Sequence, residues 1–191
     1  MRILVLSDCS DEKETGKKLE EELIGKLRSK SYDFKHYNIG KEEINKCIGC
    51  FGCWITSPGM CIFDDMTREI CRESMNSDVY VILSEIKYGC YSPKIKRVLD
   101  RSIGNVLPFF KIIKGEMHHA PRYERYPDLC FIGYGAGITR EEEETFRELG
   151  QANAINFQVE KAETYICRGL QETEAVVDRL AGYIEKRGGE K

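Results

Sequence analysis

Apolar and polar residues alternate along the chain in blocks that predict strands followed by helices. Arg2–Ser7 is an apolar, β-branched run typical of a buried strand. Leu19, Leu23 and Leu27 then recur at a spacing of four, which marks one face of a helix. Further strands are expected at 32–36, 78–86, 129–133 and 164–167, and further helices after Asp65, at Pro93, after Thr139 and around 176–184.

Five such alternations predict a doubly wound α/β fold in a single domain covering 1–191. Its five-stranded parallel sheet would carry helices on both faces, because right-handed crossovers place them there. In such sheets, ligands bind outside the carboxyl ends of the strands, where the strand order reverses. We therefore expect Ser7–Thr15, Ser84–Ser92 and Gly133–Gly137 to form one binding site.

Composition narrows the classes of partner. Lysine and arginine number 29 against 32 acidic residues in 191, a formal charge of −3, which leaves no basic face for nucleic acid. No apolar run is long enough for a signal peptide or a membrane span. We expect a soluble cytoplasmic protein with no nucleic-acid or membrane partner, whose charged tail, about 186–191, is frayed.

Four of the nine cysteines gather in a loop insert at about 46–63, just before the third expected strand. Without an export signal, they indicate thiols, metal ligands or redox groups rather than structural disulfides. Cys47, Cys50 and Cys53 follow the spacing of the bacterial ferredoxin run. Pro58–Gly59 would let the chain turn back, so that Cys61 completes a four-thiolate shell.

Three occupants of this cysteine loop remain open. An iron–sulfur cluster of the [4Fe–4S] kind suits the spacing of the first three cysteines, although the fourth comes later than in ferredoxins. Zinc also accepts four thiolates, although its sites usually come as two separated CxxC pairs. In the third case, the thiols bind no metal and pack as small apolar groups around Trp54.

Several stretches together resemble the flavodoxin-like NADPH-dependent FMN reductase family and its iron–sulfur flavoprotein relatives. They are residues 47–54 (CIGCFGCW), Gly59, Cys61, 64–66 (DDM), 88–92 (YGCYS), Lys96, 99–101 (LDR), 115–119 (GEMHH) and 122–123 (RY). The resemblance implies a flavodoxin-like fold and an FMN enzyme that passes electrons between NAD(P)H and a flavin, quinone or redox protein partner. It also implies a homodimer or homotetramer with the flavin at the subunit boundary.

The resemblance assigns flavin-binding roles to three loops and names no catalytic side chain. The implied residues are Ser7, Ser10 and Thr15 for the phosphate, Ile86, Lys87, Tyr88 and Gly89 beside the ring, and Gly133 and Gly135 where the backbone approaches the ligand. The first loop departs from the family pattern, because Ser10 replaces an arginine. Four acidic residues also stand there, Asp8, Asp11, Glu12 and Glu14.

In the second loop, Ser84–Glu85 replaces the family's threonine–proline. These departures motivate one alternative, a flavodoxin-fold binding protein that has lost FMN. A further alternative is a thiol-based redox protein that uses the cysteine cluster alone. His118 and His119 are adjacent, so on an extended segment they would point in opposite directions and not share a metal. The run Glu141–Glu144 is expected to be a solvated helix face.

Overall fold

The computed structural model describes residues 1–10, 12–159 and 162–189. Asp11 of the acidic first loop and the last two residues of the expected tail lie outside the described residues.

The main sheet has five parallel strands in the order β2-β1-β3-β6-β7. The strands are β1 (Arg2–Ser7), β2 (Asp33–Asn38), β3 (Val79–Glu85), β6 (Asp128–Tyr134) and β7 (Ala162–Cys167). The three central strands are almost wholly buried, because helices cover both faces of the sheet and leave no face for polar side chains. The strand order is that of flavodoxin-like folds, whose reversal point lies between β1 and β3.

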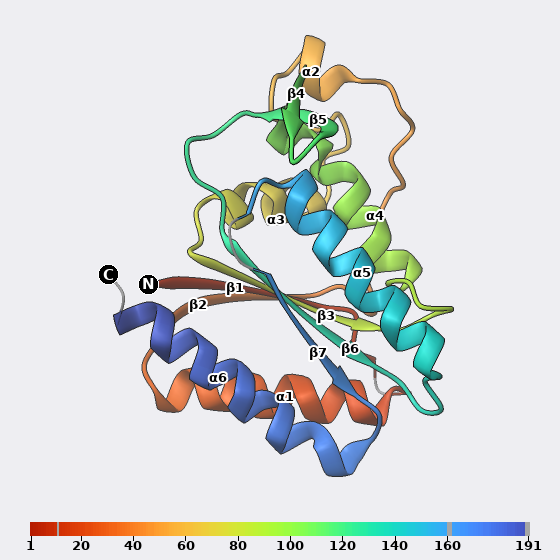
Figure 1. Ribbon diagram of the computed structural model, residues 1–191, viewed down its shortest axis with the longest axis vertical. Coiled ribbons are helices and arrows are strands. Elements are labelled where there is room, and N and C mark those ends of the chain that lie inside the picture. The colour runs from red at the N-terminus through yellow and green to blue at the C-terminus, as the bar shows by residue number, and fades with distance from the viewer. Residues whose placement is uncertain (11, 160–161, 190–191) are drawn as a thin grey trace.

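Helices cover the sheet in two layers (Figure 1). Helices α1 (Glu14–Ser29) and α6 (Thr173–Gly189) lie on one face, and α3 (Met66–Met75), α4 (Pro93–Arg101) and α5 (Arg140–Asn156) on the other. Each layer closes its own apolar core, one around Leu19 and Leu180, the other around Ile95 and Phe146. The expected doubly wound fold is confirmed.

The helices on the second face begin where capping residues satisfy their free amides. Asp65 accepts a hydrogen bond from the Thr67 amide at 3.0 Å, as its position before α3 predicts. Ser92 caps α4 ahead of Pro93. Thr139 and Glu142 form a capping box at α5. None of the helices in the described ranges is long and apolar enough to cross a membrane.

An antiparallel hairpin that the sequence pattern did not predict stands apart from the main sheet. It joins β4 (Val106–Ile113) to β5 (Glu116–Pro121), and Lys114 and Gly115 turn the chain with positive φ angles of 50° and 87°. The short helix α2 (Gly52–Ile55) lies beside this hairpin, beyond the layer of α3, α4 and α5 (Figure 1). Two 3₁₀ turns complete the fold, η1 (Ser102–Asn105) and η2 (Leu170–Glu172).

Candidate functional site

The three loops expected to form a site are joined by one buried carboxylate. Asp8, which follows β1, is 1% exposed. Its Oδ1 accepts a hydrogen bond from the Tyr134 hydroxyl at 2.8 Å and from the Glu85 amide at 3.3 Å. Tyr134 ends β6 and Glu85 ends β3, so this side chain ties together the carboxyl ends of three neighbouring strands. The sequence-based expectation that these loops meet is confirmed.

Ion pairs extend from this carboxylate across the reversal point between β1 and β3. Lys13 Nζ lies 3.3 Å from Asp8 Oδ2 and 3.1 Å from Glu85 Oε2. Glu85 Oε1 also lies 2.7 Å from Lys87 Nζ. Burial alone would lower the pKa of Lys13, but Asp8 and Glu85 outweigh it and raise that pKa. Burial would raise the pKa of Glu85, and the two lysines instead hold it below its usual range.

The three residues implied for a phosphate differ in accessibility. Ser7 is fully buried; its hydroxyl donates to the Glu20 carboxylate and lies 3.1 Å from His36 Nε2. Ser10 and Thr15 are half-buried around the start of α1. No side chain of the described residues caps this helix, so its first amides are available to an anion. A cleft of about 280 Å³ opens beside Ser10, towards the end of β2.

The second loop is a tight turn whose tip points into solvent. Lys87 and Cys90 exchange two backbone hydrogen bonds of 2.9 Å, and Tyr88 and Gly89 between them have φ angles of 53° and 74°. These values define a type I′ turn. The Tyr88 side chain is 92% exposed, and within the described chain neither its amide nor that of Gly89 has a hydrogen-bond partner.

Beneath these two loops the backbone is closely packed. Ile86 is buried, and its amide donates to the Tyr134 carbonyl at 2.9 Å. A Cβ on Gly133 would come within 2.6 Å of the Ile86 side chain, so only glycine fits there. The Gly135 amide donates to the Cys167 carbonyl at 3.2 Å. Of the residues expected to bind flavin, Ser7, Ile86 and Gly133 are therefore the packed floor residues, while Ser10, Thr15, Lys87, Tyr88 and Gly135 are the more accessible rim residues of the candidate site.

The four cysteines of the loop insert line one small cavity, away from these loops. Cys47, Cys50, Cys53 and Cys61 surround about 40 Å³ together with apolar side chains and Arg101. Gly59, at φ 82°, turns the chain back as expected, and its amide donates to the Cys53 carbonyl at 2.8 Å. Burial and the neighbouring Cys61 raise the pKa of the Cys53 thiol.

Arg101 brings a buried positive charge to this cysteine cavity. Its side chain is fully buried; Nη1 pairs with Asp65 at 2.7 Å and Nη2 donates to the Phe63 carbonyl at 3.0 Å. Its Nε has no hydrogen-bond partner in the part of the chain described. The Cys61 thiol and Asp65 outweigh burial and raise the pKa of Arg101. A buried cation with a free N–H beside four thiols fits an anionic group.

A single metal ion fits this cavity less well. Among the described side chains, no three or more of His, Cys, Asp and Glu converge closely enough to bind one ion. A zinc ion requires four thiolates about 2.3 Å from one point.

A column of stacked rings, which the sequence did not indicate, connects the cysteine loop to the hairpin. Phe51 stacks on Trp54 at 5.2 Å, Trp54 meets His119 at 4.9 Å, and His119 stacks on Phe110 at 5.1 Å between ring centroids. The Trp54 Nε1 donates to the Val106 carbonyl at 2.9 Å. His118 contacts Glu116 and Asn156 instead, so the two histidines diverge, as their adjacency on a strand predicts.

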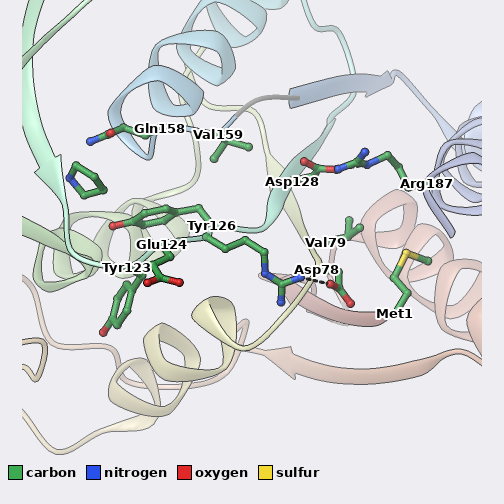
Figure 2. Close-up of a pocket in the computed structure, with 12 residues that line it drawn as sticks. Met1, Asp78, Val79, Tyr123, Glu124, Tyr126, Asp128, Gln158, Val159 and Arg187 are labelled. Carbon is green, nitrogen blue, oxygen red and sulfur yellow. Dashed lines mark hydrogen bonds and ion pairs between the residues drawn. The ribbon is translucent and has the colours of Figure 1, made fainter. Parts of the chain in front are cut away.

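A cavity of about 460 Å³ lies at the opposite edge of the sheet, near the amino ends of β3 and β6 (Figure 2). Asp78, Tyr126, Asp128 and Arg187 line it. Four of its charged residues are paired with one another: Arg125 Nη1 lies 2.7 Å from Asp78 Oδ1, and Arg187 pairs with Asp128. None of the residues expected to bind a cofactor borders it.

Solved structures share this fold. An azoreductase from Bacillus anthracis matches with a TM-score of 0.66 at 11% identity, over 94% of each chain. An NAD(P)H:quinone oxidoreductase from Methanothermobacter marburgensis matches with a TM-score of 0.64 at 12% identity, over 93% of each chain. An FMN-dependent NADH-azoreductase from Bacillus anthracis, in complex with FMN, matches with a TM-score of 0.64 at 13% identity, over 95% of this chain and 100% of that one. The chain has the flavodoxin-like fold of these reductases.

At the level of sequence, the chain is similar to an iron–sulfur flavoprotein of Methanocaldococcus jannaschii. The two are 26% identical over 84 residues, so the match spans 44% of this chain and 42% of the relative. No protein-family model matches the chain.

Proposed function

We propose that the protein is an FMN-dependent oxidoreductase of the cytoplasm that takes electrons from NAD(P)H and passes them to a flavin, quinone or redox protein. One observation carries the proposal: three loops meet at the β1/β3 reversal point in a fold shared with FMN-dependent reductases. When bound, FMN supplies the redox chemistry. The chain supplies position, charge and exclusion of water, so no side chain is given a catalytic role.

In this proposal the rim residues hold the cofactor and the floor residues shape its site. The phosphate lies at the start of α1, beside Ser10 and Thr15. The free amides of Tyr88 and Gly89 bind polar edges of the ring, and the exposed Tyr88 side chain covers its face. Lys87 orients Glu85 and Gly135 lets the backbone approach, while Ser7, Ile86 and Gly133 keep the strand ends closely packed beneath.

We further propose that Cys47, Cys50, Cys53 and Cys61 hold a [4Fe–4S] cluster that exchanges single electrons with the flavin. The shared cavity, the free Nε of Arg101 and the likeness to an iron–sulfur flavoprotein support this. The thiols lie at the C-terminal end of α4, whose N-terminal end follows the second loop. The nine residues of α4 span about 13 Å, so within one chain the thiols and the second loop are separated by a distance of this order.

Titration with FMN tests the flavin proposal. We expect purified protein mixed with excess FMN and desalted to keep a flavin absorption spectrum, which NADH or NADPH then bleaches. A protein that remains colourless after this treatment contradicts the proposal and favours a flavodoxin-fold binding protein that has lost FMN.

Anaerobic purification followed by iron, sulfide and zinc analysis tests the cluster. We expect four irons and four sulfides per chain, as the [4Fe–4S] formula requires. One zinc and no iron would replace the cluster with a zinc site. If neither iron nor zinc is found, the thiols themselves remain as the redox groups.

We also propose a homodimer or homotetramer. The support is a set of large apolar side chains that are exposed on the cysteine loop and the hairpin. We call this set the apolar surface; it consists of Ile48, Phe51, Ile55, Met60, Ile62, Phe109, Phe110, Ile112 and Met117. Together they expose roughly 1,000 Å², taking usual side-chain areas, which is about one partner's share of a standard interface.

A further inference from the structure

Lys13 lies across the crevice where the proposed cofactor would bind. Its ammonium group joins Asp8 at the end of β1 to Glu85 at the end of β3, with N–O distances of 3.3 and 3.1 Å. Those two strands are neighbours, and the chain reverses its direction of winding between them. The ion pairs therefore span the point at which a doubly wound fold receives its ligand.

The charges in this network already balance. Lys13 and Lys87 stand against Asp8 and Glu85, so two cations meet two anions. Asp8 is 1% exposed and is held by the Tyr134 hydroxyl and the Glu85 amide, so it does not turn away towards solvent. The Lys13 side chain is 27% exposed, and its ammonium group contacts the carboxylates of Asp8 and Glu85 and the Asp8 carbonyl, all groups of the protein itself.

This balance matters because a flavin phosphate is a dianion. To contact Lys13, the phosphate has to share it with Asp8 and Glu85, and carboxylate–phosphate repulsion in a partly buried site offsets the attraction. The flavin ring and the ribityl chain carry no net charge and meet no such repulsion. The ring-binding loop around Tyr88 lies outside the ion-pair network, with the exception of Lys87.

We propose that Asp8 and Glu85 withhold Lys13 from the cofactor phosphate, so that the site binds flavin mainly through its ring and ribityl chain. This inference rests on the proposed function and names the determinant of its ligand specificity. It follows that riboflavin binds nearly as tightly as FMN, and that Glu85 is a specificity-determining residue.

Flavin fluorescence titrations measure the ratio of the Kd of riboflavin to that of FMN. In the wild-type protein we expect a ratio below about ten, because the phosphate adds little net affinity. In Glu85→Gln, Lys13 loses one of its two carboxylates, so we expect FMN to bind about tenfold more tightly while riboflavin is unchanged. Adding Lys13→Met to Glu85→Gln should remove that gain.

Glu163→Gln is the matched control, because it removes the same charge from an exposed position near the amino end of β7, at the opposite edge of the sheet. Its ratio should equal that of the wild type. A wild-type preference for FMN above a hundredfold, or an unchanged ratio in folded Glu85→Gln, overturns the inference and leaves the proposed function standing. Failure of both flavins to bind any of the proteins removes the proposed function and the inference with it.

Discussion

Arg101 carries a full positive charge inside the protein, at the end of α4. Its side chain is 0% exposed and its main partner, Asp65, also caps α3. Removing one member of a buried ion pair leaves the other charge without compensation. One residue therefore connects the start of α3, the end of α4 and the cysteine cavity.

We predict that Arg101→Met lowers the free energy of unfolding by about 3 kcal/mol. Arg125→Met is the matched control, because Arg125 makes a similar ion pair with Asp78 at 2.7 Å but is 62% exposed. Its loss should cost less than about 1 kcal/mol. Urea unfolding followed by circular dichroism measures both values. Equal costs for the two variants would contradict the role assigned to burial.

Glu20 provides a pH-dependent contribution to stability. Burial alone would raise its pKa, but hydrogen bonds from His36, Ser7 and Asn38 hold that pKa below its ordinary value of 4.5. Because the folded pKa is depressed, the stabilisation is present above pH 4.5 and is lost as the pH falls through the folded value.

Glu20→Gln should therefore be less stable than the wild type at pH 7 by about 1–3 kcal/mol. The difference should shrink steadily below pH 4.5. Denaturant midpoints measured between pH 7 and pH 3 give the two curves. Parallel curves over that whole range would show that the carboxylate is not the stabilising species.

At the scale of elements, the acidic run at the start of α5 does more than face solvent. Glu142 completes the capping box with Thr139. Glu143 pairs with Arg147 at 2.9 Å and also with Arg168, which follows β7. Glu141 and Glu144 are exposed and Glu142 and Glu143 half-exposed, so the run lies on a solvated face whose two middle residues also make a cap and ion pairs.

Thr139→Ala should destabilise the protein by about 1 kcal/mol, since it leaves the α5 amides without their cap. Thr145→Ala on the same helix is the control. That threonine is exposed in the helix interior, where alanine is the better helix former, so its replacement should be neutral or slightly stabilising. Thermal melts of the two variants would contradict this account if Thr145→Ala were the more damaging.

The turn at Tyr88–Gly89 offers a second test at this scale. Gly89 and Gly137 have almost the same φ, 74° and 73°, so alanine is strained by about 1–2 kcal/mol at either position. A Cβ at Gly89 would also lie 2.7 Å from the Thr145 Cβ, whereas Gly137 has nothing within 4 Å. We expect Gly89→Ala to be the more destabilising of the two in chemical unfolding. Equal values would mean that α5 moves aside.

At the scale of the whole molecule, the three loops of the candidate site and the region of α2 and the hairpin lie on different sides of the layer formed by α3, α4 and α5. The three loops proposed to bind flavin lie at the carboxyl edge of the sheet, while α2 and the hairpin lie beyond α3, α4 and α5 (Figure 1). The apolar surface belongs to the second of these regions. A two-stranded hairpin is only marginally stable by itself, so covering its apolar side chains would stabilise it.

We predict that Phe110→Ser weakens self-association, moving the molecular mass in dilute solution towards that of a single chain. Phe110 is 66% exposed on the apolar surface and pairs with His119 across the hairpin. Lys111→Ser, at an exposed neighbouring position of the same strand, should leave the mass unchanged. Light scattering coupled to size exclusion measures it. A wild-type protein that is a single chain at high concentration would contradict the proposed assembly.

Local pattern was sufficient for much of this fold. The three central strands were predictable because buried parallel strands are continuous apolar runs, and the edge strand β2 because its aromatic residues alternate with polar ones. Helices α3, α4 and α5 begin at capping residues that the sequence displays. The hairpin was not predicted, because its strands mix exposed apolar and polar residues without a clear period of two. A lysine–glycine pair between apolar runs was its one local signal.

The order of strands and helices, the loops that meet at one edge and the spacing of the four cysteines could all be read from the chain. Each of these depends on neighbours in the chain, whose geometry is set by local backbone preference and burial pattern. Only the tertiary structure decided that Lys13 bridges Asp8 and Glu85, that Arg101 is buried beside Cys61, and that the cysteine cavity lies a helix length from the loops. Those features join residues far apart in sequence, and long-range contacts depend on how the layers pack rather than on any local pattern.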